Sequence, residues 1–375
     1  MKRIETSPRP DWQNTIVQQG FLFNEGGNYW KENAAYSFTE AEILEIEKAT
    51  SEIFSMCCEA VEYVIKREWY DRFFIDPKYA ELIRWSWFED QPSLYGRMDL
   101  SYNNGSIKLL EFNADTPTSL LESSVIQWYW LQDVKPKADQ FNSIHEKLIA
   151  HYKVIRGWMK SNRMHFCCTE DSLEDLMTVK YMEDAARQAG LDTRFLYMNQ
   201  LGFDTQKQGF TDDQFDEIET IFKLYPYEWM MAEEFGPELI TTREKCWWIE
   251  PAWKMILSNK MILTVLHDLF PRSPYILPCK TTRPLSGDFV EKPIFSREGA
   301  NVDIWINGKS VEKTGGEYGS EGYVYQQYAA LPDYDGNHPV IGSWLIGGEP
   351  AGMGIRESDG LITNNASRFV PHFFE

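Results

Sequence analysis

The chain has 375 residues, 25% of them charged and 43% hydrophobic, and a formal net charge of −20 at pH 7. This acidity argues against a nucleic-acid partner, whose phosphates need basic surface; it suits a cationic substrate such as a polyamine, although it also serves plain solubility. Since no apolar run could span a membrane and the first residues do not resemble a signal peptide, we expect a cytoplasmic protein without a membrane partner.

A long amphipathic helix is the first element that the sequence predicts. Thr39 and Glu42 have the spacing of a capping box. Apolar residues then recur at helical spacing, namely Ile43, Ile46, Ile53, Cys57, Val61 and Val64.

The next segment, 95–118, predicts a β-hairpin with one polar face. Since strand residues alternate faces, Arg97 and Asp99 share one side of the first strand, and Glu111 and Asn113 share one side of the second. Acids opposed across two strands destabilise a bare hairpin, so a bound hard cation would explain them, and oxygen ligands favour magnesium. The alternative is a surface ion-pair cluster in which Arg97 neutralises the two acids.

The turn decides whether the two polar pairs meet. A three-residue loop, Asn104 to Ser106, would pair Asn103 with Ile107 and bring the four polar side chains to one face. A two-residue loop would put them on opposite faces. We prefer the longer loop because it also gives the other face an apolar set: Met98, Leu100, Leu110 and Phe112.

The middle of the chain predicts helices and a small parallel α/β lobe. We expect helices over 119–130, 144–158 and 172–190 and strands over 164–169, 193–198 and 218–224. Strands joined by a capped helix form a βαβ unit, which places the lobe between about Phe141 and Glu238.

Strands dominate from residue 288 onward. They are expected over 289–293, 301–306, 323–327, 340–346 and 352–356, with hairpin turns at 307–308 and 347–348. Lys292 ends the first strand, and the following loop, Ser296 to Asn301, can fold its N–H groups and Arg297 over phosphates. The loop lacks the Walker pattern. Lys260, Gln326, Gln327 and Arg356 support the same reading, although each could be an ordinary surface residue.

Together these motifs resemble the synthetase domain of glutathionylspermidine synthases, in particular the stand-alone branch of ATP-dependent acid–amine ligases. The similarity covers nearly the whole chain and is carried by segments 95–122, 291–299, 323–328 and 341–372. It implies an ATP-grasp-type fold, mixing α+β and α/β structure, with a small parallel α/β lobe inserted. Residues 1–118 would hold N-terminal helices and the metal-binding hairpin, 119–240 a helical segment and the lobe, and 241–375 the lid and an antiparallel sheet.

The resemblance also implies roles for individual residues. Arg97 and Arg356 would be catalytic, and Asp99, Glu111 and Asn113 would hold Mg²⁺. Thr116, Thr118 and Glu228 would meet the substrates, Glu228 on charge grounds alone, as for Asp115. ATP would contact Arg97, Met98, Asp99, Lys260, Lys292, Arg297, Glu298, Gly299, Gln326, Gln327, Tyr328, Ala329, Leu361, Ile362 and Thr363.

The function implied is an ATP-dependent carboxylate–amine ligase that forms an amide through an acyl phosphate. Its partners would be a small carboxylate, such as glutathione or another peptide, and an amine such as a polyamine. Two departures matter: Ser296 stands where the family's lid has glycine, and the amidase domain of bifunctional members is missing. The alternatives are a non-ligating ATP-binding regulatory protein and a phosphotransferase. The six cysteines lack zinc or disulfide spacing and are read as buried thiols.

Overall fold

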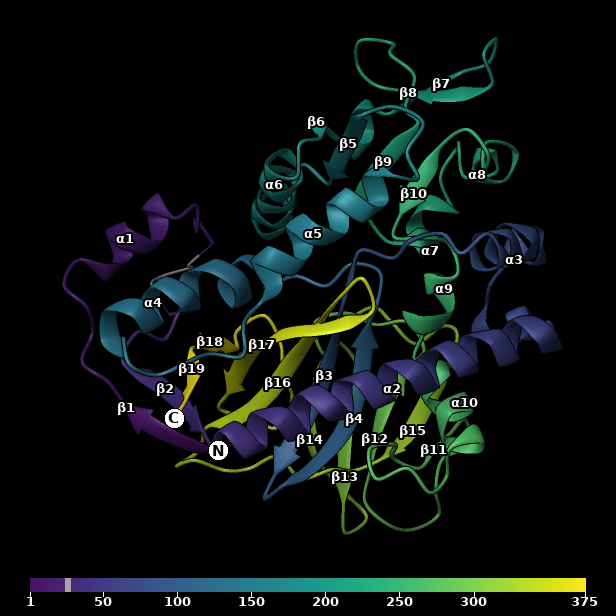
Figure 1. Cartoon of the computed structure of the whole chain (residues 1–375). Coiled ribbons are helices and arrows are strands. Elements are labelled where there is room, and N and C mark those ends of the chain that lie inside the picture. Colours follow the sequence, from purple (N-terminus) through teal and green to yellow (C-terminus); the bar gives the residue numbers. More distant parts are fainter. Residues whose placement is uncertain (24–27) are drawn as a thin grey trace.

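The predicted polar hairpin forms one edge of an antiparallel sheet (Figure 1). A computed structural model describes residues 1–23 and 28–375 of the chain. The strand order of this sheet is β18 (Arg368–Val370), β17 (Glu349–Ser358), β16 (His338–Ile346), β3 (Tyr95–Asn103) and β4 (Ser106–Asn113). Helix α2 (Glu40–Arg67) packs across the sheet against β4, β16 and β17.

The sequence of α2 explains both its start and its orientation. Thr39 accepts a hydrogen bond from the backbone N–H of Glu42, and the Glu42 carboxylate accepts one from the N–H of Thr39, so the predicted capping box is confirmed. The predicted apolar stripe of this helix is buried against the sheet, as shown by Ile43, Ile46, Ile53, Cys57, Val61 and Val64.

A second antiparallel sheet faces the first. Its order is β11 (Cys279–Lys280), β15 (Tyr323–Gln327), β12 (Phe289–Pro293), β13 (Asp303–Ile306) and β14 (Lys309–Lys313). Strands β12 and β15 have the predicted bounds, and the hairpin turn at Asn307 and Gly308 is confirmed. Strand β13 starts two residues later than predicted, because Asn301 adopts a positive φ of 55° that ends the preceding loop.

The predicted parallel lobe is also present. Its strand order is β10 (Trp247–Ile249), β9 (Thr220–Leu224), β5 (Arg163–Cys168) and β6 (Asp192–Tyr197), and all three pairings are parallel. Helix α6 (Leu173–Gln188) connects β5 to β6 and is capped by Ser172, as expected. Strand β10 lies beyond Glu238 yet joins this sheet, so the lobe takes up more of the chain than its predicted span. Helix α5 (Ile144–Arg156) packs against α6 and also against β16, which joins the lobe to the first sheet.

Shorter elements complete the described chain. Strands β1 (Lys2–Glu5), β2 (Ala34–Phe38) and β19 (His372–Phe374) form a small sheet, and β7 (Gly202–Asp204) pairs with β8 (Gly209–Thr211). The remaining helices are α1 (Trp12–Gln18), α3 (Ala80–Phe88), α4 (Gln127–Val134), α7 (Tyr227–Met230), α8 (Glu238–Thr241), α9 (Lys254–Leu257) and α10 (Ile262–Leu269). A π-helical turn, Glu122–Ile126, precedes α4, and 3-10 turns span Trp69–Phe73, Pro77–Tyr79 and Met198–Gln200. Among residues 1–23 and 28–375, every helix is too short or too polar to cross a membrane.

The turn between β3 and β4 differs from the prediction. Asn103 pairs with Ser106, so the loop has two residues and not three. A regular hairpin with this turn would put the acidic residues on opposite faces. A β-bulge next to Asp99 adds one residue to β4 and sets Asp99 opposite Glu111 after all. The predicted pairing is therefore confirmed, although the loop length offered as its cause was wrong.

Leu110 is the extra residue of this bulge. It was expected on the apolar face, but it is partly exposed, whereas its neighbour Leu109 is buried in the core. Beyond the bulge the regular pairing resumes, and Arg97 lies opposite Asn113. The bulge thus gives the polar face both carboxylates and one leucine.

A buried ion pair holds the open end of the hairpin. Lys254 Nζ lies 2.9 Å from the Glu250 carboxylate and donates to the carbonyls of Tyr95 at 2.6 Å and Ala114 at 3.0 Å. Glu250 in turn accepts the N–H groups of Leu94 and Tyr95. The first residue of β3 and the residue after β4 are therefore tied to the same two side chains.

A second buried pair fixes the turn that follows the hairpin. Lys223 Nζ, on β9 of the lobe, lies 2.6 Å from the Asp115 carboxylate, and both side chains are almost fully buried. Asp115 also accepts the N–H of Tyr227 at 3.2 Å. The suggestion that Asp115 contacts a substrate ammonium group was wrong, because a lysine of the protein already occupies it.

We predict that Lys223→Met destabilises the fold strongly. It leaves the Asp115 carboxylate buried without its partner, and breaking a buried pair in this way typically costs about 3–5 kcal/mol in the free energy of unfolding. Urea denaturation followed by tryptophan fluorescence measures the loss. Adding Asp115→Asn should recover much of it. Lys66→Met, which breaks an exposed pair with Glu62, is the control and should change little; an equal loss in both variants would contradict the assignment.

Candidate active site

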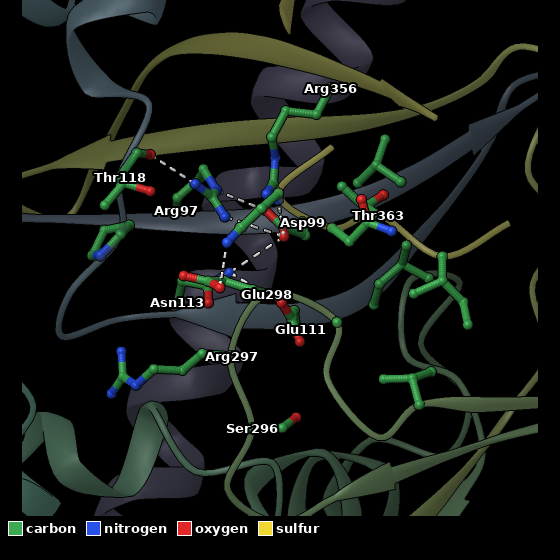
Figure 2. A pocket seen from close by; sticks show the side chains of 18 of the residues that line it. Arg97, Asp99, Glu111, Asn113, Thr118, Ser296, Arg297, Glu298, Arg356 and Thr363 are labelled. Carbon is green, nitrogen blue, oxygen red and sulfur yellow. Dashed lines mark hydrogen bonds and ion pairs between the residues drawn. The ribbon is translucent and has the colours of Figure 1, made fainter. Parts of the chain in front are cut away.

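A cavity of about 460 Å³ lies between the two five-stranded sheets and the edge of the lobe. Its walls come from β3, β4 and β17 of the first sheet, from β12, β13 and β15 of the second, and from the start of α6. Residues that are far apart in the sequence therefore share one chamber, and Figure 2 shows the polar side of it.

Most of the residues expected to form a site line this cavity. They are Arg97, Asp99, Glu111, Asn113, Thr116, Thr118, Lys260, Lys292, Arg297, Glu298, Gly299, Gln326, Gln327, Tyr328, Ala329, Arg356, Leu361, Ile362 and Thr363. Two do not. The side chain of Met98 is buried in the core on the other face of β3, and Glu228 lines a smaller neighbouring cavity of about 40 Å³.

The Asp99 carboxylate is gripped by two guanidinium groups. Arg97 Nε lies 2.8 Å from Asp99 Oδ1, and Arg356 Nη2 lies 2.7 Å from Asp99 Oδ2 (Figure 2). Arg97 Nη1 also donates to the carbonyl of Thr118 at 2.7 Å. Arg97 is held in one orientation by these bonds, while Arg356 keeps part of its side chain exposed to the cavity.

Glu111 is surrounded by positive charge. Burial by itself would raise the pKa of this carboxyl, but the nearby cations, Lys260 foremost, outweigh it and lower the pKa to about 2. Lys260 Nζ lies 3.4 Å from Glu111 Oε2. Burial lowers the pKa of Lys292, and the charge of Glu111 opposes that shift. The carboxylate is therefore ionised at neutral pH and available to a cation.

The polar face of the hairpin has the donor chemistry of a magnesium site. Asn113 donates its amide N–H groups to Asp99 Oδ2 and Glu111 Oε1, both at 3.3 Å. Its amide oxygen takes no part in these two bonds and is a further possible ligand. Carboxylate and amide oxygens are hard ligands, as Mg²⁺ prefers. Within the described part of the chain, no three His, Cys, Asp or Glu side chains gather in a metal-binding group. A cation here would need further oxygens, such as those of a phosphate or water.

The β4 bulge links this face to the second sheet. Lys292 Nζ donates to the carbonyl of Leu110 at 2.9 Å and to Gln326 Oε1 at 2.7 Å. Gln326 Nε2 donates to the carbonyl of Leu109 at 3.0 Å. Two carbonyl groups on β4, the edge strand of the first sheet, are thus bonded by side chains of β12 and β15.

An apolar slot continues the cavity away from the charges. Its lining residues are Val290, Val302, Ile304, Leu331, Val340, Leu361 and Ile362, most of which form a separate small cluster with Tyr328. A flat aromatic ring fits this kind of surface, and the lysines and arginines line the opposite end of the cavity.

The loop after β12 covers the cavity. Arg297 Nη1 donates to Thr116 Oγ1 at 2.5 Å, and its Nη2 lies 2.7 Å from Glu228 Oε1. Its guanidinium carbon lies 5.5 Å from the centre of the Trp229 ring. Lys260 donates to the carbonyl of Ser296 at 2.8 Å. Glu228 therefore contacts a residue of the large cavity, Arg297, although it does not line that cavity itself. The loop is held in place by Thr116, Glu228 and Lys260.

The far side of the same loop rests on residues 361–365. Gly299 has a φ of +68°, and a Cβ at this position would lie 2.5 Å from the carbonyl oxygen of Thr363. Asn365 donates to the Glu298 carboxylate. Glu312 accepts the N–H groups of Leu361 and Ile362 and so fixes the segment on which the loop rests.

An acidic wall opposite the hairpin was not predicted. Asp171, Glu174 and Asp175, at the start of α6, line the cavity together with Tyr29. Burial, and then the charge of Glu174, raise the pKa of Asp175 to about 7, and burial raises the pKa of Glu174. The signal was available: Asp171 precedes Ser172, and Glu174 and Asp175 follow it, just beyond the carboxyl end of β5, the position where parallel sheets bind ligands. The sequence analysis used only Ser172, as the cap of the predicted helix.

Comparisons with known proteins agree with this geometry. A family model described as glutathionylspermidine synthase preATP-grasp matches residues 3–375. A Haemophilus influenzae protein, provisionally named an acid–amine ligase, is 40% identical over 394 residues that cover 100% of both chains. The bifunctional glutathionylspermidine synthetase/amidase of Escherichia coli is 27% identical over 96% of this chain and 61% of that protein. Trypanothione synthetase of Crithidia fasciculata is 29% identical over 77% of this chain and 48% of that protein.

A solved structure supports the fold. The glutathione synthetase-like effector of Globodera pallida superposes with a TM-score of 0.61 at 10% identity, covering 99% of this chain and 98% of that one. The predicted ATP-grasp fold of mixed α/β structure, with its parallel lobe, is therefore confirmed.

We predict that Gly299→Ala loosens the loop over the cavity. The new methyl group would press on the Thr363 carbonyl, and φ +68° is strained for alanine. Trypsin should then cut after Arg297 several times faster, which peptide mapping of a time course detects. Gly287→Ala is the matched control, because Gly287 has a similar φ of +93° with open space around it. Equal cleavage rates in the two variants would show that the contact does not hold the loop.

Proposed function

Because the chain belongs to the glutathionylspermidine synthase family and is a ligase, we propose that it uses ATP to join a carboxylate to an amine through an acyl phosphate. One observation carries the proposal. Four cationic side chains converge on two carboxylates at the charged end of a cavity whose other end is apolar: Arg97, Arg356, Lys260 and Lys292.

Physical chemistry links this arrangement to the reaction. A carboxylate does not react with an amine at neutral pH, because its oxygen is a poor leaving group, whereas the phosphate of an acyl phosphate leaves readily. The barrier to making the acyl phosphate is repulsion between the carboxylate and the γ-phosphate of ATP, which fixed positive charge reduces. Arg97 is locked by Asp99 and Thr118, so its charge needs no reorganisation during the reaction.

The remaining predicted roles follow the shape of the cavity. The adenine ring of ATP would occupy the apolar slot near Tyr328, and Lys260, Lys292 and the loop with Arg297 would face its phosphates. Asp99, Glu111 and Asn113 would hold Mg²⁺, which neutralises phosphate charge when bound. The loop that covers the cavity would keep water from the acyl phosphate.

Two further parts of the cavity wall suggest the classes of substrate. Thr116 and Thr118 lie beside Arg297 and Arg97, which suits an acid substrate. Glu174 and Asp175 form an acidic wall, which suits a cationic amine. The relatives are named for glutathionylspermidine and trypanothione, so we propose a glutathione-like peptide carboxylate and a polyamine as the two substrates.

The test is ADP release with Mg²⁺, ATP, glutathione as the acid and spermidine as the amine. We expect ADP and an amide product in equal amounts, with both substrates required. Mass spectrometry identifies the product, and a mixed pool of acids and amines extends the search to other pairs. ADP without an amide would instead favour a phosphotransferase, and ATP binding without turnover a regulatory protein.

Asp99→Asn and Glu111→Gln should each lower kcat by about a hundredfold or more while the circular dichroism spectrum is unchanged. Removing either charge disturbs both the cation site and the arrangement of the basic side chains. Glu291→Gln, a carboxyl on β12 that does not line the cavity, is the control and should keep its activity. Wild-type rates in both site variants would exclude the metal assignment.

A further inference from the structure

A buried glutamate stands behind the acidic side of the cavity without a role in the scheme above. Glu122 is 2% exposed and accepts a hydrogen bond from the hydroxyl of Tyr29 at 2.9 Å. The same hydroxyl lies 3.1 Å from Ser119 Oγ. Tyr29 and Ser119 line the cavity, whereas Glu122 does not. The hydroxyl groups of Ser119 and Tyr29 therefore connect the cavity to the Glu122 carboxylate, which lies behind the cavity wall.

The local backbone is unusual at this point. Glu122 opens the π-helical turn Glu122–Ile126, and such turns occur often at functional sites. Ser119 has a φ of +69°, which is uncommon for a residue other than glycine. Residues held in such conformations concentrate at active sites.

Ser119 is connected to Arg97 through the backbone of Thr118. Arg97 Nη1 holds the carbonyl of Thr118, and Ser119 follows directly. The backbone directly before Ser119 is therefore held by the same guanidinium group that bonds Asp99. An amine that approached a carbonyl group near Arg97 would come within reach of Ser119 and Tyr29.

We propose that Ser119, Tyr29 and Glu122 form a proton relay that deprotonates the amine substrate before it attacks. This inference rests on the proposed function, because it assigns the path of a proton in the second half of that reaction. Ser119 and Tyr29 would touch the amine, and Glu122, which acts through them, is a positioning residue and the final acceptor.

The step balances as follows. An alkylamine arrives as R–NH₃⁺ and gives one proton to the Ser119 oxygen, whose own proton passes to Tyr29, and the Tyr29 proton passes to the Glu122 carboxylate. The freed lone pair forms the C–N bond, and the C–O bond to phosphate breaks. A second nitrogen proton leaves with the phosphate as HPO₄²⁻. The amide, hydrogen phosphate and protonated Glu122 carry the same total charge as the starting groups.

The surroundings suit a proton acceptor near neutral pH. Burial, and then the charge of Glu174 on α6, raise the pKa of Glu122 to about 7, while the Tyr29 hydrogen bond and the charge of Arg97 on β3 oppose this shift. Burial and the charge of Glu122 raise the pKa of Tyr29, so this residue stays neutral and passes protons through its hydrogen bonds. An acceptor of this kind is more basic than an ordinary carboxylate and still ionised above pH 7.

The experiment compares two nucleophiles in the full-length protein. Spermidine is cationic and must lose a proton, whereas hydroxylamine is already neutral at pH 7 and traps an acyl phosphate as a hydroxamate. We expect Glu122→Gln to lower kcat for spermidine about a hundredfold and hydroxamate formation less than about threefold. Tyr29→Phe and Ser119→Ala should show the same selective loss, which covers the case that Glu122→Gln fails to fold.

The pH profile gives a second readout that a structural role would not move. For the wild type the spermidine rate should rise with pH and level off above about 7, because Glu122 accepts protons only when ionised. In Glu122→Gln the rate should keep rising about tenfold per pH unit, with the fraction of free amine. Tyr181→Phe is the matched control: Tyr181 contacts Ser124 in the same π-helical turn but does not line the cavity.

Three results would overturn the relay. Equal losses with both nucleophiles in Glu122→Gln would show a structural role, and unchanged spermidine rates in all three variants would show no role. A wild-type protein that forms neither amide nor hydroxamate would remove the proposed ligase function and the relay with it. Wild-type activity together with the first or second result would remove the relay alone.

Discussion

Two carboxylates can lie opposite each other on β3 and β4 because basic side chains from β3 itself, β12, β17 and the segment before α10 surround them. Asp99 is bonded by Arg97 and Arg356, and Glu111 is the centre of a field that includes Lys260 and Lys292. Without these cations, the acids would repel each other and destabilise the pair of strands. The site is thus built from acidic and basic side chains that compensate one another's charge.

Two further ion pairs support the hairpin, and both are buried away from solvent. Lys254 with Glu250 and Lys223 with Asp115 are almost fully buried and satisfy backbone groups at the mouth of the hairpin and in the turn after it. Buried pairs contribute little net stability compared with apolar residues, yet they tolerate few alternative arrangements. In this chain they fix one end of the strands that carry Asp99, Glu111 and Asn113, which is a requirement of geometry more than of stability.

Much of the fold and of the charged site could be predicted from local pattern. The capping box of α2, the bounds of β12 and β15, and the βαβ unit were found because each depends on neighbours in the sequence. The hairpin register was right for the wrong reason, since the bulge depends on tertiary contacts: the carbonyls of Leu109 and Leu110 are bonded by the side chains of Gln326 and Lys292, which lie far away in the sequence.

The acidic wall was missed although its place after β5 was readable, whereas the hydroxyl groups of the proposed relay were missed for a similar reason as the bulge. Tyr29 and Glu122 come from separate segments, and no spacing in the sequence links them. Asp115 was misread because nothing local shows that Lys223 will be buried beside it. Charge alone did not separate a residue that meets a ligand from one that is already paired inside the protein.

The Leu110 bulge has one further consequence. Lys292 donates to the carbonyl of Leu110, and Gln326 donates to the carbonyl of Leu109. A shift of one sheet relative to the other would therefore strain the backbone next to Glu111. ATP bound against the second sheet, as proposed, would therefore act on the backbone that carries the Glu111 carboxylate. Deletion of Leu110 would keep the two carboxylates opposite each other but remove the carbonyl through which Lys292 connects the sheets.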